Sequence, residues 1–238
     1  MIRPLNTAFS LSFTLAMSEA AIASSLVDPS GSTTRKLARF WGMTLCDVCG
    51  LEVHTEGGQG VEWEKSLIVM ANHQSFLDIP VLYAALPQPF GMLAKQELFR
   101  VPVFSSAMRA MRCVPIDRGN RRQSLESLRH AADLVRSGNS IVVFPEGTRS
   151  DDGRVHPLKK GPFYLAEMAQ VPIVPVGIRG TRDALAKNGL LVRGANVEVS
   201  IGEPIVFDHS DKRGQGARDR LREKVHSALV KLSGLEPG

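Results

Sequence analysis

The feature that most limits the fold of this chain is an alternation of short apolar runs with segments of helical periodicity. Residues 66–71, Ser-Leu-Ile-Val-Met-Ala, form an apolar run of the length of one buried strand, and residues 78–86 after them have the pattern of a helix. Comparable patterns predict strands at residues 91–94, 113–116, 140–144, 173–178 and 197–201, and helices at 123–136 and 216–232. Alternation of this kind predicts an α/β fold in which helices cover a sheet.

Length and charge bound the number of domains and the class of partner. The 238 residues, 43% of them apolar, predict one α/β domain rather than two. The formal net charge of +5 suits nucleic acid, anionic lipid or phosphorylated small molecules. One basic run, which would also suit a solvated face, contains a single acidic residue, Asp117, and six arginines: Arg100, Arg109, Arg112, Arg118, Arg121 and Arg122. Because the whole chain has only two Trp and two Tyr for base stacking, we predict no nucleic-acid partner.

The N-terminal part differs in composition from the rest. We predict a membrane-associated segment and linker at residues 1–34, followed by the folded domain at residues 35–238. Residues 8–17 are mildly apolar, but polar side chains interrupt the run, so a helix that spans the whole bilayer is not expected. Two alternatives fit: a helix lying in one leaflet of a membrane, or a signal peptide cleaved near residues 21–23. Residues 28–32, Asp-Pro-Ser-Gly-Ser, are typical of a linker.

The three cysteines allow at most one disulfide, so no disulfide framework is predicted. Cys46 and Cys49 form a C-x-x-C pair. A structural zinc site needs two more ligands at suitable spacing, and a redox pair is expected beside a strand-to-helix junction. The pair lies instead in an apolar stretch, residues 40–51, that is typical of a helix. We therefore predict two buried thiols and no metal site.

The first chemical signature comes directly after the strand predicted at residues 66–71. It reads Asn-His-Gln-Ser-Phe-Leu-Asp and places His73 on the turn between strand and helix, with Asp78 five residues later in the first helical turn. A carboxylate there can face the imidazole, fix its tautomer and stabilise the imidazolium that forms when the histidine takes a proton. The same spacing is also common in surface hydrogen bonds and helix caps, so it does not establish a catalytic pair by itself.

The second signature, Phe-Pro-Glu-Gly-Thr-Arg-Ser at residues 144–150, also follows a predicted buried strand. Gly147 permits close approach of the backbone to a ligand, while Glu146 and Arg149 supply a carboxylate and a bidentate anion donor on the same turn. The alternative is an ordinary glycine turn with a solvated arginine. Open α/β sheets bind ligands at the carboxyl ends of their strands, so both signatures are expected at one edge of the sheet.

Taken in order, with Arg118 between them, the two signatures resemble the glycerolipid acyltransferase family, and the bacterial 1-acyl-glycerol-3-phosphate acyltransferases in particular. The resemblance runs from about residue 35 to residue 205. All four motifs of that family have a counterpart in this order: residues 72–78, 114–118, 144–150 and 171–176. The resemblance implies a central mixed or mostly parallel sheet wrapped by helices, with an N-terminal membrane-contacting helical element.

The resemblance also implies a reaction and roles for the site residues. A fatty acyl group would pass from acyl-CoA or acyl-ACP to the free hydroxyl of 1-acyl-sn-glycerol 3-phosphate, forming phosphatidic acid, with His73 as general base and Asp78 as its partner. Seven residues are implied in binding the acceptor or its phosphate: Lys95, Arg118, Glu146, Gly147, Thr148, Arg149 and Lys160. Four residues are either strand and turn residues or part of an acyl-donor channel: Val171, Pro172, Ile173 and Pro175.

The implied partners are a lysophospholipid acceptor, an acyl thioester and the membrane surface at the cytoplasmic face of the inner (cell) membrane, with no cofactor and no metal. Three alternatives stay open. A different acceptor, such as glycerol 3-phosphate or a lyso-aminolipid, would use the same motifs. A non-catalytic lipid-binding protein could keep the fold, although it would not need His73, Asp78 and Arg149 together. A hydrolase could use His73 and Asp78 around a metal, or Ser75 as a nucleophile.

Overall fold

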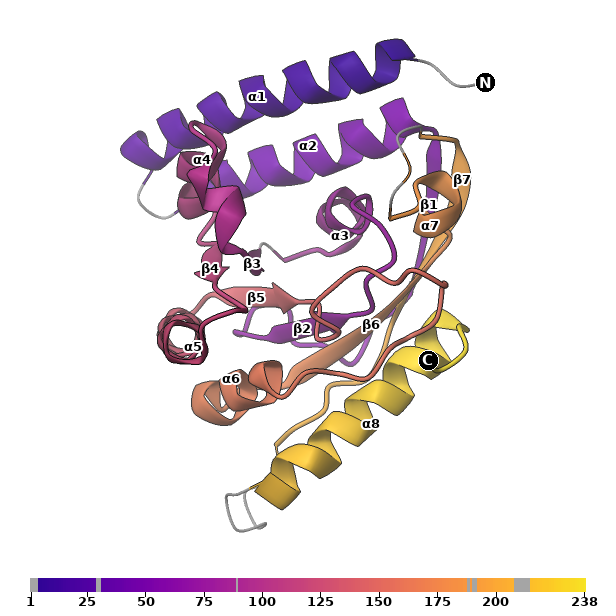
Figure 1. The fold of residues 1–238 in the computed structure, drawn as a ribbon. Coiled ribbons are helices and arrows are strands. Elements are labelled where there is room, and N and C mark those ends of the chain that lie inside the picture. Colours follow the sequence, from indigo (N-terminus) through magenta and orange to yellow (C-terminus); the bar gives the residue numbers. More distant parts are fainter. Residues whose placement is uncertain (1–3, 29–30, 89, 188, 190–191, 208–214) are drawn as a thin grey trace.

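The computed structural model describes residues 4–28, 31–88, 90–187, 189, 192–207 and 215–238 (Figure 1). Its strands form one sheet in the order β1-β7-β6-β2-β5-β3-β4. Their bounds are β1 Leu51–Gly57, β2 Ile68–Ala71, β3 Phe90–Lys95, β4 Val114–Ile116, β5 Ser140–Val143, β6 Ile173–Arg179 and β7 Ala195–Ile201. Neighbouring strands run parallel except β6 and β7, which run antiparallel, so the predicted mixed, mostly parallel sheet is confirmed.

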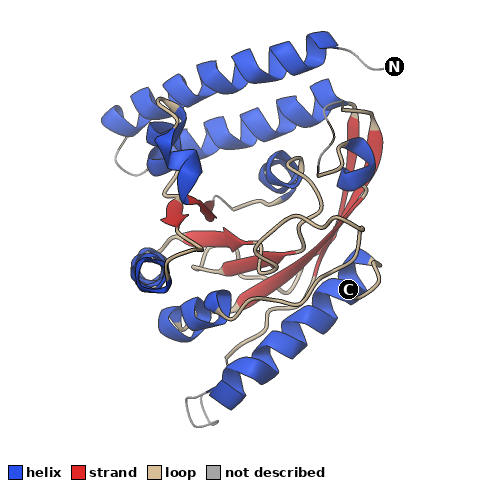
Figure 2. Cartoon of the chain, viewed as in Figure 1, coloured by secondary structure: helices blue, strands red, loops and turns tan. Residues whose placement is uncertain are grey.

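Helices cover both faces of this sheet (Figure 2). They are α1 Pro4–Val27, α2 Ser32–Cys49, α3 Asp78–Ala85, the 3-10 helix η1 Gln96–Arg100, α4 Phe104–Ala110, α5 Arg121–Arg136, α6 Gly161–Ala169, α7 Thr181–Ala184 and α8 Gln215–Ser233. The alternation of side chains along β2 produces two cores. Val69 and Ala71 pack in the core with α2 and α3, while Ile68 and Met70 pack in the core with α5, α6 and α8.

The predicted strands and helices after residue 60 are confirmed to within two residues of their bounds. Other elements were missed. Strand β1 lies at the edge of the sheet and only Leu51 in it is fully buried, so its pattern is too polar to indicate a strand. The helices η1, α4 and α7 are too short to show a helical period, and α6 begins with Gly161-Pro162, a pair typical of turns. The helix predicted at residues 40–51 is the second half of α2, which ends at Cys49 because Gly50 adopts a left-handed conformation and caps it.

The N-terminal helix α1 packs along α2 rather than standing apart from the domain (Figure 1). Ser24 Oγ lies 2.7 Å from Thr34 Oγ1, and Trp41 Nε1 donates to Thr14 Oγ1 at 3.0 Å. The division predicted at residue 34 therefore falls inside α2. Residues 29 and 30 of the predicted linker lie outside the described residues.

The outer side of α1 is apolar and exposed. Its large exposed apolar side chains are Phe9, Leu11, Leu15, Leu26 and Val27. The stretch Phe9–Val27 is long and apolar enough to cross a membrane by length and composition, and 17% of it is buried inside the protein. The arrangement suits contact with a membrane, while the depth of insertion stays a prediction.

Cys46 and Cys49 are free thiols on the buried side of α2, which confirms the prediction of two buried thiols. Burial raises the pKa of Cys46 to about 12 and also raises the pKa of Cys49. Neither thiol is ionised at neutral pH, and the thiolate is the form that binds metals and attacks electrophiles. The pair therefore contributes to packing.

Candidate active site

Two turns at the carboxyl edge of the sheet form the candidate site. Strands β2 and β5 are parallel neighbours, so the turn at His73 after β2 meets the turn at residues 144–150 after β5. The amide N–H of Ser150 donates to His73 O at 2.8 Å, and the amide N–H of His73 donates to Glu146 Oε1 at 2.7 Å. The structure thus brings the two sequence signatures into one site.

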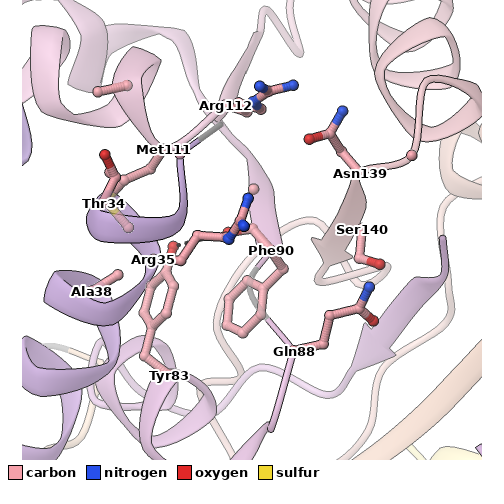
Figure 3. A pocket seen from close by; sticks show the side chains of 14 residues that line it. Thr34, Arg35, Ala38, Tyr83, Gln88, Phe90, Met111, Arg112, Asn139 and Ser140 are labelled. Carbon is pink, nitrogen blue, oxygen red and sulfur yellow. Dashed lines mark hydrogen bonds between the residues drawn. The ribbon is translucent and has the colours of Figure 1, made fainter. Parts of the chain in front are cut away.

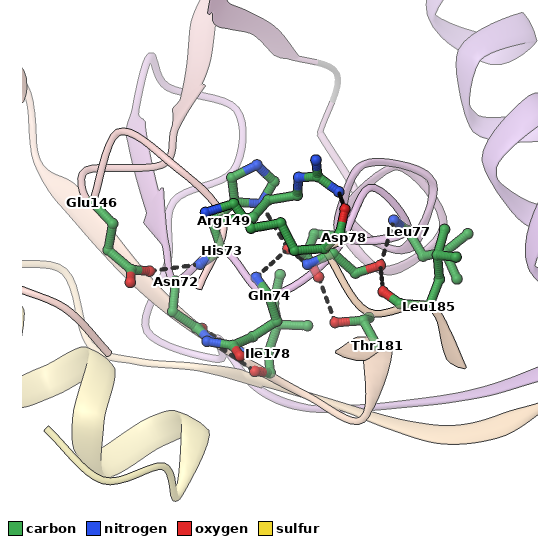
Figure 4. Close-up of polar contacts among 12 residues, drawn as sticks. Asn72, His73, Gln74, Leu77, Asp78, Glu146, Arg149, Ile178, Thr181 and Leu185 are labelled. Carbon is green, nitrogen blue, oxygen red and sulfur yellow. Dashed lines mark hydrogen bonds and ion pairs between the residues drawn. The ribbon is translucent and has the colours of Figure 1, made fainter. Parts of the chain in front are cut away.

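His73 and Asp78 form a hydrogen-bonded pair at the centre of this site (Figure 4). His73 Nδ1 lies 2.8 Å from Asp78 Oδ2; the Asp78 side chain is fully buried, and 14% of the His73 side chain is exposed. Asp78 Oδ2 also accepts from the amide N–H groups of Gln74 and Ser75, at 2.7 and 2.9 Å. Because an ionised carboxylate only accepts hydrogen bonds, Nδ1 carries the proton, and Nε2 is left as the basic nitrogen.

One face of the His73 imidazole packs against the Phe144 ring. The His73 and Phe144 rings stack with their centroids 3.9 Å apart and their planes 14° apart. Phe144 is the first residue of the second signature, so the β5 turn contributes to the orientation of the histidine. A ring fixed at Nδ1 and on one face presents Nε2 in one direction, which is what a general base needs.

Two side-chain contacts tie this loop to β6 and α7. Asn72 forms two hydrogen bonds with the backbone of Ile178, from Asn72 Nδ2 to Ile178 O at 2.8 Å and from Ile178 N to Asn72 Oδ1 at 2.7 Å. Thr181 Oγ1 donates to Asp78 Oδ1 at 2.5 Å. Thr181 was not among the site residues predicted from the sequence. Its partner lies 103 residues away in the chain, and its position three residues after a predicted strand is the sequence signal that could have indicated it.

Glu146 is buried behind the two turns, with 2% of its surface exposed. Its Oε1 accepts from the His73 amide at 2.7 Å, and its Oε2 accepts from the His156 amide at 2.9 Å. Burial raises the pKa of Glu146 to about 7, although these two hydrogen bonds act in the opposite direction. Because backbone donors occupy both oxygens, the structure favours support of the His73 loop over contact with an acceptor.

The turn after Glu146 requires glycine. Gly147 has a φ of 76°, and a Cβ built on it would lie 3.2 Å from Lys159 Cγ. The Arg118 guanidinium, from the loop between β4 and α5, donates to the Gly147 carbonyl through Nη1. Thr148, the next residue, is exposed. Arg118 and the second signature are therefore neighbours in space, as the predicted phosphate site needs.

Arg149 is held from two sides. Its guanidinium carbon lies 3.6 Å from the centroid of the Phe76 ring, and its Nη1 donates to Lys187 O at 2.8 Å. Partial burial lowers the pKa of Arg149, and the negative charge of Asp78 opposes this change. A guanidinium has five N–H donors, so one bond to a carbonyl leaves donors that can bind an anion beside the His73–Asp78 pair.

The other predicted binding residues lie on further elements, and Lys95 is the last residue of β3, at the same carboxyl edge of the sheet as His73. Lys95 Nζ is 3.3 Å from Glu97 Oε1. Lys160 lines a surface recess together with three arginines, Arg121, Arg218 and Arg222. The four residues of the predicted donor channel precede or begin β6: Val171, Pro172, Ile173 and Pro175. Since Ile68 at the start of β2 pairs with Ile173, Val171, Pro172 and Ile173 lie at the opposite edge of the sheet from His73, whereas Pro175 pairs with Met70 near the carboxyl end of β2. Their roles in binding stay predictions.

Ser75 is not placed to act as a nucleophile. The side chain is fully buried, and its Oγ donates to Leu185 O at 2.6 Å. A substrate carbonyl would have to displace this bond and enter the packed loop to reach the hydroxyl. Within the described ranges, no group of three or more His, Cys, Asp and Glu side chains is arranged to hold a metal ion.

An apolar cavity of about 110 Å³ lies among α1, α2, α3, α4 and β3. Its wall includes Ile79, the residue after Asp78, together with side chains of α1, α2, α4 and β3 such as Trp41, Met92 and Met108. The lining is almost entirely aliphatic, aromatic or sulfur-containing. It suits a hydrocarbon chain.

A polar pocket of about 70 Å³ lies elsewhere (Figure 3). Arg35, Arg112, Gln88 and Asn139 surround it, and the first residues of β3 and β5 form its floor. Strand β2 runs parallel to β5 and β3, and His73 follows its carboxyl end. The pocket, at the first residues of β3 and β5, therefore lies at the opposite edge of the sheet from the His73–Asp78 pair. It is therefore not part of the candidate active site.

Residues 51–179 match the family model described as acyltransferase. The chain is 38% identical to the chloroplastic 1-acyl-sn-glycerol-3-phosphate acyltransferase BAT2 of Brassica napus, over 67% of this chain and 46% of the relative. It is 33% identical to a 1-acyl-sn-glycerol-3-phosphate acyltransferase of Saccharomyces cerevisiae, over 77% of this chain and 61% of the relative. The match to the Brassica relative thus spans about half of that protein.

The fold is similar to a solved structure along almost its whole length. The crystal structure of the 1-acyl-sn-glycerophosphate acyltransferase PlsC from Thermotoga maritima superposes with a TM-score of 0.81 and 25% sequence identity. The match covers 96% of this chain and 95% of the PlsC chain.

Proposed function

The chain belongs to the acyltransferase family, and on that premise we propose that it transfers a fatty acyl group to the free hydroxyl of 1-acyl-sn-glycerol 3-phosphate, forming phosphatidic acid for phospholipid synthesis. The donor would be an acyl thioester, acyl-CoA or acyl-ACP. The observation that carries the proposal is the His73–Asp78 pair, which leaves one ring nitrogen basic at the carboxyl edge of the sheet. The names of the relatives and of PlsC support the choice of acceptor.

In this mechanism His73 Nε2 removes the proton from the acceptor hydroxyl while the hydroxyl oxygen attacks the thioester carbonyl. The C–O bond forms, the C–S bond breaks, and the imidazolium passes its proton to the departing thiolate. The charge of Asp78 stabilises the imidazolium during this step. The route needs no covalent acyl-enzyme, which agrees with the buried position of Ser75.

Arg149 and Arg118 are the residues we assign to the acceptor phosphate. Arg149 is stacked on Phe76 and lies near Asp78, while Arg118, from the loop between β4 and α5, reaches the Gly147 carbonyl on the same turn as Arg149. A guanidinium matches two phosphate oxygens in a fork, so two arginines on neighbouring turns suit a phosphomonoester. This arrangement favours a phosphate-bearing acceptor over a lyso-aminolipid.

The acyl chain of the donor would occupy the apolar cavity described above. Its lining includes Ile79, the residue after Asp78, and side chains of α1, α2 and α4. Burying a hydrocarbon chain there is favourable by about 0.8 kcal/mol for each methylene removed from water. The four motif residues at the start of β6 do not line this cavity.

We place the protein at the cytoplasmic face of the cell membrane, attached through α1. The exposed apolar side chains of α1 support attachment, and its packing against α2 supports a retained helix rather than a cleaved signal. Acyl-CoA and acyl-ACP are water-soluble donors, so an active site beside the membrane surface can meet both donor and lipid acceptor.

The proposal is tested by the product. Membranes that contain the full chain are incubated with labelled acyl-CoA or acyl-ACP and a panel of acceptors: lysophosphatidic acid, glycerol 3-phosphate, a lyso-aminolipid and a phosphate-free monoacylglycerol. We expect labelled phosphatidic acid from lysophosphatidic acid. Release of free fatty acid without a labelled lipid would indicate a hydrolase, and absence of thioester consumption would indicate a lipid-binding protein.

A further inference from the structure

We propose that Thr181 is a positioning residue for the catalytic pair, one that holds Asp78 so that its second oxygen faces His73. The inference rests on the transfer reaction proposed above. Thr181 is fully buried, and its hydroxyl donates to Asp78 Oδ1 at 2.5 Å (Figure 4). It lies just beyond residues 51–179, the part of the chain that matches the family model.

The two oxygens of Asp78 have different partners. Oδ2 lies within hydrogen-bonding distance of His73 Nδ1 and accepts from the amides of Gln74 and Ser75, all at 2.7–2.9 Å. In the described part of the chain, Oδ1 accepts one bond, from Thr181. A carboxylate held at only one oxygen can turn about the bond that joins it to Cβ, since that torsion is broad. The Thr181 hydroxyl restricts this rotation and keeps Oδ2 aimed at Nδ1.

The segment that carries Thr181 also contacts the rest of the site. Leu185 O accepts from Ser75 Oγ at 2.6 Å, and Lys187 O accepts from Arg149 Nη1 at 2.8 Å. Lys187 Nζ lies 2.8 Å from Asp151 Oδ2, next to the second signature. One segment, residues 181–187, therefore links the general base, its loop and the arginine assigned to the phosphate. Thr181 is the contact of this segment with Asp78, the partner of the base.

A tight turn of the backbone fixes the position of Thr181. Gly180, the residue before it, has a φ of 95°, and a Cβ there would lie 2.1 Å from Asn196 O. The chain therefore turns sharply at the end of β6, against β7, and delivers the Thr181 hydroxyl to the buried carboxylate. A buried hydroxyl fixed in this way loses little entropy when it bonds Asp78.

The test compares Thr181→Val, which keeps the shape and removes the donor, with Thr181→Ser, which keeps the donor. We expect Thr181→Val to lower kcat about 10- to 100-fold and to leave the acceptor KM within about twofold, because the phosphate contacts stay in place. Thr181→Ser should recover most of the kcat. The matched control is Thr34→Val, which removes a buried hydroxyl contact with Ser24, far from the site, and should leave kcat unchanged.

The pH profile separates positioning from a loss of packing. Without the Thr181 donor, the Asp78 carboxylate turns away from Nδ1 and stabilises the imidazolium less, so the acid limb of kcat/KM should move to lower pH by about half a unit or more in Thr181→Val. It should return in Thr181→Ser. A Thr181→Val enzyme with wild-type kcat, or one whose loss is matched by Thr34→Val and whose acid limb is unmoved, would overturn the proposal.

A readout without turnover keeps this inference separate from the proposed reaction. The proton between His73 Nδ1 and Asp78 should give a downfield NMR resonance in the full chain, assigned by its loss in His73→Gln. We expect this resonance to shift or broaden in Thr181→Val and to be restored in Thr181→Ser. An unchanged resonance would refute the positioning role, whereas failure of the wild type to acylate any acceptor would refute only the proposed function.

Discussion

Replacing Glu146 by Gln tests how a buried carboxylate supports the catalytic loop. Folding raises the pKa of Glu146 from 4.5 to about 7 because the side chain is buried. Between these values the native state holds a proton that the unfolded chain has released, so native stability is lost as pH rises through this range. At about 1.4 kcal/mol for each pKa unit, the loss between pH 5 and pH 8 is about 3 kcal/mol.

The side chain introduced by Glu146→Gln does not titrate, so the variant does not show this loss of native stability as pH rises. Its amide oxygen can still accept one of the two backbone N–H groups, from His73 or His156, but its NH₂ group faces the other donor. That mismatch costs about 1–3 kcal/mol and is the same at every pH. The free energy of unfolding of the wild type minus that of the variant should therefore fall by about 3 kcal/mol from pH 5 to pH 8.

The assay is urea unfolding in detergent at a series of pH values, followed by fluorescence of the two tryptophans, Trp41 and Trp63. All other groups titrate alike in both proteins and cancel in the difference. Glu126→Gln, at an exposed carboxylate on α5, is the matched control and should give a difference that does not change with pH. If the free energy of unfolding of the wild type minus that of Glu146→Gln is constant, or grows with pH, the raised pKa of the buried Glu146 carboxylate is refuted.

The same variant separates support of the loop from contact with the acceptor. If Glu146 holds the His73 amide, Glu146→Gln should lower kcat because the imidazole shifts, and the KM for the acceptor should change little. If Glu146 binds the acceptor, as the sequence resemblance implies, the KM should rise and kcat should hold. Steady-state kinetics at pH 8 with varied lysophosphatidic acid distinguish the two.

Three further predictions concern the base, the phosphate site and the membrane helix. His73→Ala should lower kcat about 10²- to 10⁴-fold with an unchanged thermal transition, and wild-type turnover would refute the general-base mechanism. Arg149→Ala should lower kcat/KM for lysophosphatidic acid about 10- to 150-fold, with Arg149→Lys intermediate because it lacks the fork; an equal effect on the acyl donor would contradict the assignment. Leu11→Gln combined with Leu15→Gln should move the protein from the membrane pellet towards the soluble fraction, since both side chains are exposed on α1; unchanged pelleting would place the attachment elsewhere.

Much of the fold was readable in the sequence. Buried parallel strands are short continuous apolar runs, so β2, β5 and β6 were visible within two residues of their bounds. The two signatures directly follow such strands, and parallel neighbours end at the same edge of a sheet. The pairing of His73 with Asp78 was predictable from local spacing, because Asp78 begins α3 only five residues after His73.

The contacts of Glu146 and Thr181 were decided only by the tertiary structure. The resemblance implies acceptor binding for Glu146, whereas the fold buries this side chain under the His73 amide, and no local pattern indicates which way a side chain on a tight turn points. Thr181 meets Asp78 from 103 residues away because β6 lies beside β2 in the sheet. Sequence periodicity predicts which face of a helix or strand is buried, because apolar residues on that face recur with the period of the element. It cannot report which buried donors and acceptors from distant segments meet, because strand order and the packing of the loops decide that.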